Sequence, residues 1–320
     1  MEILLSTFSL VQSWLFETVI NPFVYYAGLG SFTEEAYDAT EWLLIGVCEL
    51  VLLFIVLRPL EALIPVQKIS DSRARRMDFL YTVIYRLGAM SLVVFFVLGP
   101  LFDQINSLLH LQGIKAFDLE NLWPGVTDYP LVSFMVYLIV LDFCDYWYHR
   151  FEHQFSWSWA LHSLHHSQQN MNLWSDNRNH LLDDFIRSIV MAVIALAIGV
   201  QPGQYVLLIA CSRILQSLQH ANVRIHFGAL GERLLVSPRY HRQHHAIGLG
   251  HESAGAGTLG GHNFAVLFPI WDILFGTALF SAEFAATGVR DQLAPPAGIE
   301  RDYGRGFWAQ QWRGLQRMFG

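Results

Sequence analysis

The chain has 320 residues, of which 53% are hydrophobic and only 15% are charged, and its mean hydropathy is +0.33. A soluble domain typically carries about 25% charged residues, so this chain has too little polar surface to face water on all sides. The formal net charge of −7, without a long Lys/Arg-rich run, argues against a nucleic-acid-binding protein. Cys48, Cys144 and Cys211 lie in apolar segments, and we expect packed free thiols there. Composition therefore indicates an integral membrane protein.

The first third of the chain contains one amphipathic segment and two apolar segments of membrane-spanning length. Residues 4–20 are apolar with polar interruptions, which favours a helix that lies in the membrane interface and is ended by Asn21-Pro22. Residues 42–66 are long enough to cross a hydrocarbon core, which needs about 20 residues. Residues 79–102 form a second predicted span.

A third predicted span, residues 131–145, runs directly into a cluster of histidines. Farther along, residues 185–200 and 205–218 form two apolar helices joined by a Gln-Pro-Gly turn. Each is slightly short for a full crossing, so we expect a hairpin that dips through or nearly through the bilayer and returns. The rest of the chain is rich in glycine and ends with the amphipathic segment 305–319.

Basic residues predict the orientation of these spans. Residues 68–76 carry four basic residues, whereas 103–129, expected to be a loop, carries one lysine with four acidic residues. The positive-inside rule therefore places 68–76 in the cytoplasm. The third span and the hairpin then bring every histidine cluster to the same side. The expected fold is an all-α polytopic membrane bundle, of about four spans or three plus a short hairpin, with a cytoplasmic histidine-rich helical cap.

Eight histidines form three tight clusters, a ninth lies between the last two clusters, and the pattern H-x-x-H-H occurs twice. They are His149, His153, His162, His165, His166, His220, His241, His244 and His245. On a helix, an i, i+4 pair shares one face and can chelate one ion, while a neighbour at i+3 can turn toward a second ion. Nine imidazoles exceed what one ion needs, so we expect two ions. Imidazole suits Zn, Cu, Fe and Ni, so ligand type alone does not select the metal.

At least two of the carboxylates near the clusters are expected to support the histidines, with helix capping or solvation at the membrane interface as the alternative. Ligating imidazoles normally donate their second N–H to a carboxylate or a carbonyl. The candidates are Asp142, Asp145, Asp176, Asp183 and Asp184. His180 and His226 are further candidates for a metal ligand or a supporting residue. For His110, His251 and His262 we expect ordinary solvated or hydrogen-bonded side chains.

Four motifs, in this order, resemble those of the fatty acid hydroxylase/sterol desaturase superfamily: Tyr148-His149-x3-His153, Leu161-His162-x2-His165-His166-Ser167, Gln219-His220-Ala221-Asn222 and Pro238-x2-His241-x2-His244-His245. The similarity runs from about residue 135 to 280 and includes Asn263-Phe264 and Trp271-Asp272-x2-Phe275-Gly276-Thr277. It implies non-haem di-iron chemistry on the cytoplasmic face, in which O2 is activated and a C–H bond of a lipid or sterol is attacked. The nine clustered histidines are the iron ligands that the resemblance implies.

The resemblance also implies a division of the chain. A catalytic domain over residues 131–285 would follow an interfacial helix and spans over 1–130, and a tail over 286–320 would end the chain. His180 stands where many relatives have His-Pro-Leu-Glu, with Leu181 in place of the proline. His226 falls where the family has no fixed histidine.

Within this class the expected product is an alcohol, with desaturation or ether cleavage as alternatives. Outside it, a metal transporter would place its ligands near the bilayer midplane, and a surface zinc hydrolase would need an H-E-x-x-H motif or a similar open site. The chain has no dinucleotide fingerprint, so a separate electron-donor protein is expected. An apolar slot between the span ends is expected to admit the lipid tail. Four tryptophans are candidates to line it or to form an aromatic belt at the membrane surface: Trp147, Trp157, Trp159 and Trp174.

Overall fold

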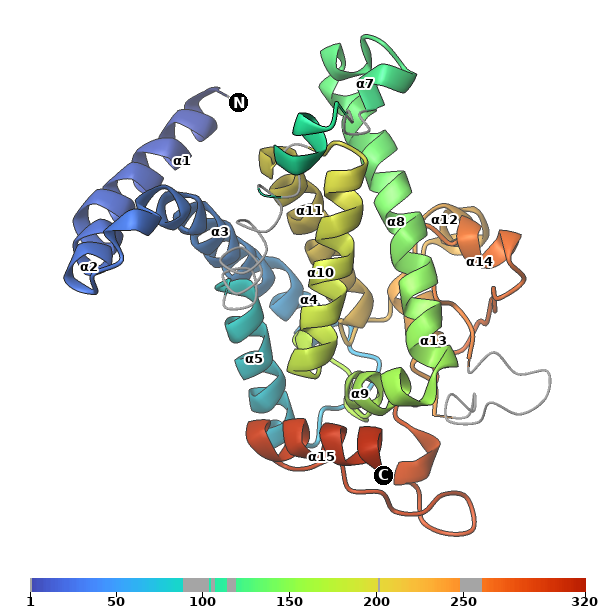
Figure 1. The fold of residues 1–320 in the computed structure, drawn as a ribbon. Coiled ribbons are helices and arrows are strands. Elements are labelled where there is room, and N and C mark those ends of the chain that lie inside the picture. The colour runs from blue at the N-terminus through green and yellow to red at the C-terminus, as the bar shows by residue number, and fades with distance from the viewer. Residues whose placement is uncertain (1, 89–103, 105–106, 114–118, 201, 248–260) are drawn as a thin grey trace. The chain divides into compact units, whose positions relative to one another are not determined.

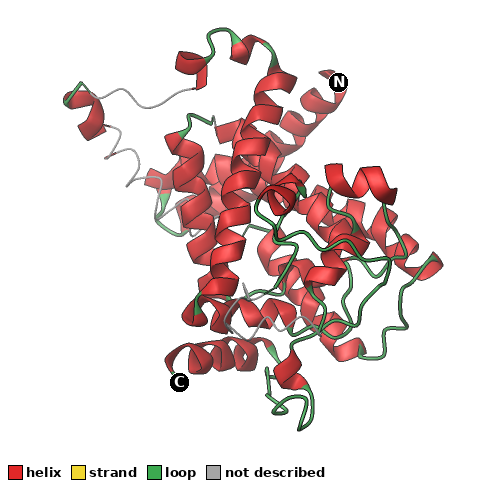
Figure 2. Ribbon diagram, turned by 90° about the vertical axis from the view of Figure 1, so that its right-hand side faces the viewer, coloured by secondary structure: helices red, strands yellow, loops and turns green. Residues whose placement is uncertain are grey.

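The computed structural model describes residues 2–88, 104, 107–113, 119–200, 202–247 and 261–320, and these ranges contain helices and loops but no strand (Figure 2). The helices before residue 100 are α1 (Glu2–Leu15), η1 (Phe16–Ile20), α2 (Asn21–Tyr26), η2 (Gly30–Phe32), α3 (Thr33–Leu52), η3 (Leu53–Leu57), α4 (Arg58–Leu63) and α5 (Ser72–Arg86). The central ones are α7 (Leu119–Leu122), η4 (Val126–Asp128), α8 (Pro130–Gln154), α9 (Ser156–His166), η5 (Ser175–Asn177), α10 (Leu181–Ala197) and α11 (Pro202–His220). The last ones are α12 (Gly228–Leu234), α13 (Pro238–His244), α14 (Ile270–Leu274), η6 (Arg290–Gln292) and α15 (Phe307–Phe319). The prediction of an all-α fold is confirmed over the described residues.

The chain divides into two compact units. The first comprises residues 1–52 and 83–116, and the second comprises residues 53–82 and 117–320. All nine clustered histidines belong to the second unit.

In the first unit the chain stays helical from α1 to Tyr26. The prediction that Asn21-Pro22 ends the first helix is therefore wrong. The π-helical turn η1 leads directly into α2, and Pro22 lies in the first turn of α2. A proline is tolerated there, because the N–H that it lacks has no partner within the first helical turn. A buried ion pair joins Arg86 to Glu49, with Nη1 and Oε2 2.9 Å apart.

Among the described residues, two helical stretches are long and apolar enough to cross a membrane, Gly30–Leu63 and Pro130–Gln154. The first contains the predicted span 42–66 except its last three residues. The second contains the predicted span 131–145 and continues through the first histidine cluster. Helices α10 and α11 coincide with the predicted hairpin, but neither is both long enough and apolar enough to count as a membrane-spanning helix.

The predicted span 79–102 is only partly visible. Helix α5 begins at Ser72, so it starts within the segment predicted as a basic loop, and it ends at Arg86. Residues 89–103 lie outside the described part of the chain. Parts of the predicted loop 103–129 are helical, as α7 and η4 show.

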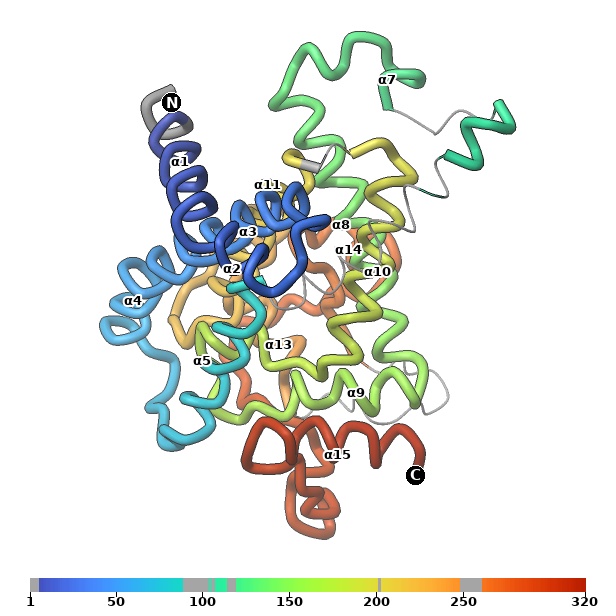
Figure 3. Tube along the Cα trace, turned by 60° about the vertical axis from the view of Figure 1, so that its left-hand side comes forward, coloured from blue at the N-terminus to red at the C-terminus, as the bar shows by residue number. Residues whose placement is uncertain are grey.

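Three long helices of the second unit, α8, α10 and α11, lie side by side (Figure 1). Apolar side chains hold them together, among them Tyr137 and Leu141 of α8, Met191 and Ala195 of α10, and Leu208 of α11. Helix α9 crosses beside the C-terminal end of α8 and the N-terminal end of α10, and α15 packs along α9 (Figures 1 and 3). The histidine clusters therefore lie at one end of the three-helix bundle.

Helix α15 is fastened to this end of the bundle by its inner face. The Gln311 side chain accepts a hydrogen bond from the Leu181 backbone N–H (2.8 Å) and donates one to the Tyr81 hydroxyl (2.9 Å). Gly314 lies so close to the His180 ring that a Cβ atom would approach Cδ2 to 2.4 Å. Trp308 and Trp312 are exposed on the opposite face. The prediction of an amphipathic C-terminal helix is confirmed.

Candidate metal centre

The nine clustered histidines come from four helices, α8, α9, α11 and α13, and all nine are buried. Local sequence explains how the shortest of these helices forms. The Ser237 Oγ accepts a hydrogen bond from the Tyr240 N–H (3.1 Å), and Pro238 occupies the first turn of α13. Both features favour helix initiation at this point. The helix has seven residues, which include His241 and His244, and His245 is its C-cap.

The histidines form two sets of four, in each of which one ring nitrogen per residue lies within 4.8 Å of the others. The first histidine group is His149, His153, His162 and His166. The second histidine group is His165, His220, His241 and His245. His244 forms a third, overlapping set with His166 and His245, so it links the two groups. The structure thus brings all nine predicted residues into one continuous cluster.

The H-x-x-H-H pattern divides its histidines between the two groups. In α9 the i, i+4 pair His162 and His166 belongs to the first group, and His165 points to the second. In α13 the assignment is reversed: His241 and His245 belong to the second group. His244 instead packs its ring 4.5 Å from that of His149 in the first group. Helical spacing therefore produces two groups from two copies of one motif, as the sequence predicts.

The nitrogens of the second group converge as metal ligands do. The Nε2 atom of His220 lies 3.1 Å from Nε2 of His165 and 3.0 Å from Nε2 of His241, which in turn lies 3.1 Å from Nε2 of His245. Hydrogen bonds cannot account for this arrangement, because each of these nitrogens has either one proton or one lone pair. Nitrogens bound to one ion at about 2.0–2.1 Å lie roughly 3.0–3.4 Å apart. The observed spacing fits a shared ion.

A buried ring nitrogen of the first group supports the same conclusion. Within the described part of the chain, His162 Nε2 has no hydrogen-bond partner. Leaving a buried polar atom unsatisfied costs about 1–3 kcal/mol. A bound cation would satisfy this nitrogen, and the all-imidazole donor set suits a transition metal.

The opposite ring nitrogens of three histidines are fixed by backbone carbonyls. Nδ1 of His149 lies 2.8 Å from the Phe264 oxygen, and Nδ1 of His220 lies 2.8 Å from the Gln216 oxygen. Nδ1 of His244 lies 2.7 Å from the oxygen of His262. An Nδ1–H that donates to a carbonyl fixes the tautomer and leaves the Nε2 lone pair available to a metal.

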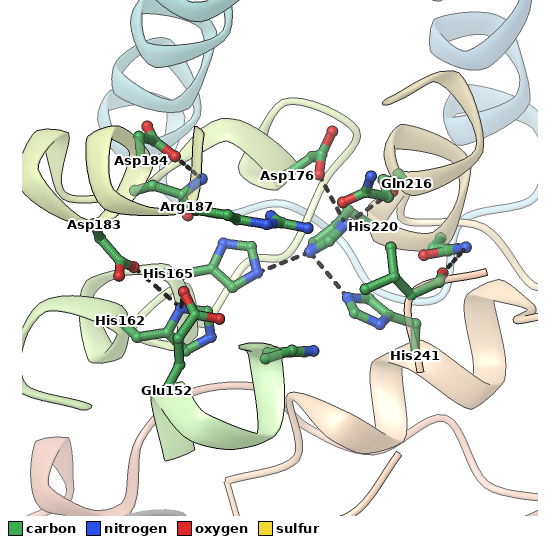
Figure 4. A pocket seen from close by; sticks show the side chains of 14 residues that line it. Glu152, His162, His165, Asp176, Asp183, Asp184, Arg187, Gln216, His220 and His241 are labelled. Carbon is green, nitrogen blue, oxygen red and sulfur yellow. Dashed lines mark hydrogen bonds and ion pairs between the residues drawn. The ribbon is translucent and has the colours of Figure 1, made fainter. Parts of the chain in front are cut away.

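Carboxylates support one histidine in each group. Nδ1 of His162 lies 3.3 Å from Asp183 and 3.4 Å from Glu152 (Figure 4). Nδ1 of His220 lies 3.6 Å from Asp176. Two of the five candidate aspartates, Asp176 and Asp183, thus approach the histidines. Glu152 was missed in the sequence, although its place immediately before His153 was a signal.

The other three candidate aspartates bind elsewhere. Asp145 accepts two hydrogen bonds from Arg187, at 2.6 and 3.0 Å, and Asp184 accepts one from Asn179 at 3.0 Å. Asp142 accepts hydrogen bonds from the backbone of residues 267 and 268 and from the indole of Trp271. Their expected role beside the histidines is not what the structure shows.

Asp272 explains why the Asn263-Phe264 and Trp271-Asp272 motifs matter to the cluster. Its carboxylate accepts hydrogen bonds from the backbone N–H groups of Phe264 and Ala265, both at 2.9 Å, and from the Tyr240 hydroxyl at 2.9 Å. This arrangement fixes the Phe264 carbonyl that binds His149. Asp272 also connects that loop to α13 through Tyr240.

The two groups differ in their electrostatics. Burial disfavours a charged His162, but the carboxylates of Glu152 and Asp183 outweigh that effect and raise its pKa to about 10. In the second group, burial lowers the pKa of His165, His241 and His245 well below the usual value, so these rings are neutral donors. In the first group burial lowers the pKa of His149 in the same way, so His162 is the ring at which carboxylates favour positive charge, whereas these other rings present lone pairs.

His180 and His226 lie outside both groups. His180 caps the N-terminus of α10: its Nδ1 accepts from the Leu182 N–H (3.1 Å), and its Nε2 lies 2.8 Å from the Gln311 oxygen. His226 is exposed, and its Nδ1 accepts from the Gly228 N–H. Both nitrogens of His180 are thus engaged by the backbone, which argues for a structural role.

A pocket touches both histidine groups, and polar side chains line nearly all of it (Figure 4). Its lining comprises five of the histidines, four carboxylates, three side-chain amides, Arg187 and Val266. The expectation of an apolar slot is not met at this pocket. None of the four candidate tryptophans is part of its lining. Trp147 and Trp157 are exposed, and Trp159 packs on His153. Trp174 packs on Phe54 and Phe79.

The fold and this site define a helical protein with a buried cluster of nine histidines, suited to hold metal ions, at the end of a helix of membrane-spanning length. Residues 134–277 match the family model described as fatty acid hydroxylase. Residues 134–277 thus carry a fatty acid hydroxylase domain, and the predicted resemblance to the fatty acid hydroxylase/sterol desaturase superfamily is confirmed.

Curated relatives agree with this assignment. Human alkylglycerol monooxygenase is 30% identical over 181 residues, which cover 56% of this chain and 36% of that protein. An ornithine lipid hydroxylase from Rhizobium tropici is 26% identical over 192 residues, 60% of this chain and 52% of that protein. A Delta(7)-sterol 5(6)-desaturase from Gibberella zeae is 27% identical over 150 residues, 46% of each chain. The matched region thus spans about half or less of these relatives, and no solved structure matches the chain.

Proposed function

We propose that this protein is a membrane-bound non-haem di-iron oxygenase that hydroxylates a C–H bond of a lipid or sterol. The observation that carries the proposal is the division of nine buried histidines into two adjacent four-histidine groups joined by His244. The names of the relatives support oxidation of a lipid. We further propose that the nine histidines are the iron ligands and that the site faces the cytoplasm at the cytoplasmic or inner membrane.

Two bound irons would supply the oxidising chemistry that acid–base groups cannot provide for an alkyl C–H bond. The overall reaction inserts one oxygen atom of O2 into the C–H bond and reduces the other to water, with two electrons and two protons taken up. We propose a separate electron-donor protein as the source of the electrons. The residues of this chain hold the rings in place: the Phe264 carbonyl orients His149, while Glu152 and Asp183 orient His162.

Desaturation by the same centre is the second candidate, because a sterol desaturase is among the relatives. It consumes the same O2 and electrons but removes two hydrogens from the substrate. Lipid mass spectrometry of a deletion strain and its complemented control separates the two outcomes. A hydroxylase leaves the deletion strain without a species that carries one additional oxygen, whereas a desaturase leaves it without a species lacking two hydrogens.

Metal analysis of the purified protein tests the proposal directly. We expect two irons per chain and O2 consumption when a reductant and a lipid extract are added. Stoichiometric zinc without O2 consumption would overturn the proposal. His165→Ala and His244→Ala should each reduce turnover to background, and full turnover in either variant contradicts the ligand assignment.

A further inference from the structure

The pocket beside the histidines is a poor environment for a hydrocarbon chain. Val266 is the one aliphatic side chain among its described lining residues, and Glu152, Asp176, Asp183 and Asp184 all contribute to it. An alkyl chain would exclude water from these carboxylates without offering hydrogen bonds in return, which is unfavourable. A polar group is therefore the better occupant.

The hydrogen-bonding capacity of the pocket indicates which polar group fits. Its single guanidinium, on Arg187, is paired with Asp145 through Nε and Nη2, so its charge toward an anionic ligand is largely offset. The carboxylates and amides leave more acceptors than donors. An occupant that donates hydrogen bonds complements this lining, whereas a phosphate would meet four carboxylates.

Gln219 supplies an independent observation. Its side chain is buried, and its Nε2 donates to the Val266 carbonyl at 2.8 Å, which fixes the orientation of the amide. Its Oε1 is buried and has no hydrogen-bond partner in the described residues. This acceptor belongs to the pocket lining and lies next in sequence to His220. A buried unsatisfied acceptor in a pocket favours a ligand that donates to it.

We propose that this pocket binds the polar headgroup of the substrate lipid through hydroxyl or ammonium donors, and that the oxidised carbon lies within a few bonds of that headgroup. This inference rests on the proposed oxygenase function. Because the pocket touches both histidine groups, a headgroup bound there places the adjoining carbon of the chain beside them. Carbons in the middle of a long alkyl chain lie too far from the headgroup to reach the same position. The bond attacked is a C–H bond, converted to C–OH with two electrons from the separate donor, and the second oxygen atom leaves as water.

Binding to zinc-loaded protein, which does not turn over, tests headgroup recognition without catalysis. The probes, in detergent micelles, are 1-O-hexadecylglycerol, its di-O-methyl ether and hexadecylamine, which is an ammonium at neutral pH. We expect the glycerol ether or the amine to bind at least about tenfold more tightly than the capped ether, which has no donor. Tight binding of the glycerol ether alone identifies hydroxyl recognition, and tight binding of the amine alone identifies ammonium recognition. Binding of all three with equal affinity, or of none, overturns the proposal.

Gln219→Leu removes the unsatisfied acceptor and should reduce the preference for the donor-bearing probe by about tenfold. Gln204→Leu is the matched control: it lies on the same helix, and its amide bonds to Ser133 outside the pocket. The control should keep the wild-type preference. An unchanged preference in Gln219→Leu contradicts the role given to this residue. The wild-type comparison of the three probes stands even if that variant does not fold.

Regiochemistry in the iron-loaded enzyme completes the test. The probe that binds most tightly is deuterated either at the first chain carbon or at the ninth, and loss of label is followed by mass spectrometry. Loss from the first carbon is the expected result. Loss from the ninth carbon overturns the headgroup inference but leaves the oxygenase intact. Donor-dependent binding without any oxidation has the opposite meaning, since it contradicts the oxygenase and preserves the pocket assignment.

Discussion

The two histidine groups are built from very different lengths of chain. The first group comes from residues 149–166, on the two consecutive helices α8 and α9. The second combines α9, α11 and α13 and extends from His165 to His245. Two carboxylates approach a ring of the first group, and one approaches a ring of the second at a longer distance. The first group is therefore a local structure with two carboxylates at one of its rings, whereas the second forms only when distant segments pack together.

Removal of one ligand should have the largest effect and should distinguish the groups. We expect His153→Ala and His241→Ala each to lose about one iron per chain, because the other group keeps its four rings. Activity should fall to background in both variants. Elemental analysis and turnover of the purified variants provide the measurement. A variant that keeps two irons and wild-type turnover would show that the substituted histidine is not a ligand.

Supporting carboxylates should have the next largest effect, and it should differ between the groups. Asp183→Asn should weaken metal binding at the first group by about tenfold, the low end of such effects, since Glu152 still faces His162. Asp176→Asn should weaken the second group by less, because the Gln216 carbonyl keeps its 2.8 Å contact with His220. Competition with a chelator measures both affinities. Equal losses in the two variants would contradict the difference proposed here.

Substitution in α15 should weaken both groups together, because α9 contributes to both. In Gly314→Ala the new Cβ meets the His180 ring, which is held at both nitrogens and cannot move aside. We expect a loss of about 1–3 kcal/mol of stability, measured by thermal denaturation in detergent. Gly306→Ala, at the N-cap of α15 with no atom within 4 Å, is the matched control and should cost no more than about 1 kcal/mol, because alanine is a poorer N-cap than glycine. Equal stability of the two variants would contradict this packing.

The smallest effects are expected for the histidines outside both groups. His180→Ala should remove a helix cap and cost about 1 kcal/mol while both irons remain. His226→Ala should change stability by less than about 0.5 kcal/mol and leave the iron content intact, because this side chain is exposed. Loss of an iron in either variant would add that residue to the centre.

The sequence predicted the site better than it predicted the helix boundaries. Clustered histidines at helical spacing specify which rings share a face, so the division of His165 from His166 followed from spacing alone. Helix ends depend on which local backbone conformation the chain adopts there, such as a π-helical turn, and the spacing of residue types does not specify that conformation. The π-helical turn before Asn21 lets the chain continue through Pro22, and no composition rule reveals such a turn.

The polar pocket could not be predicted for a different reason. Asp176 and Asp183 are near each other in the sequence, but Gln219 lies some forty residues farther along, and nothing in the sequence relates it to them. Their common orientation depends on how α10 and α11 pack beside α8. The role of Asp272 is similar, since it acts through the Phe264 carbonyl and so does not need to touch a histidine ring.

The position of α15 has a consequence for biosynthesis. Until residues 307–319 emerge from the ribosome, α9 has no partner on one side, and neither Leu181 nor His180 has its contact from Gln311. All nine imidazoles will by then have been translated, the last of them some sixty residues earlier. On the proposed function, metal can enter a fully ordered centre only after α15 has been translated and has packed against α9.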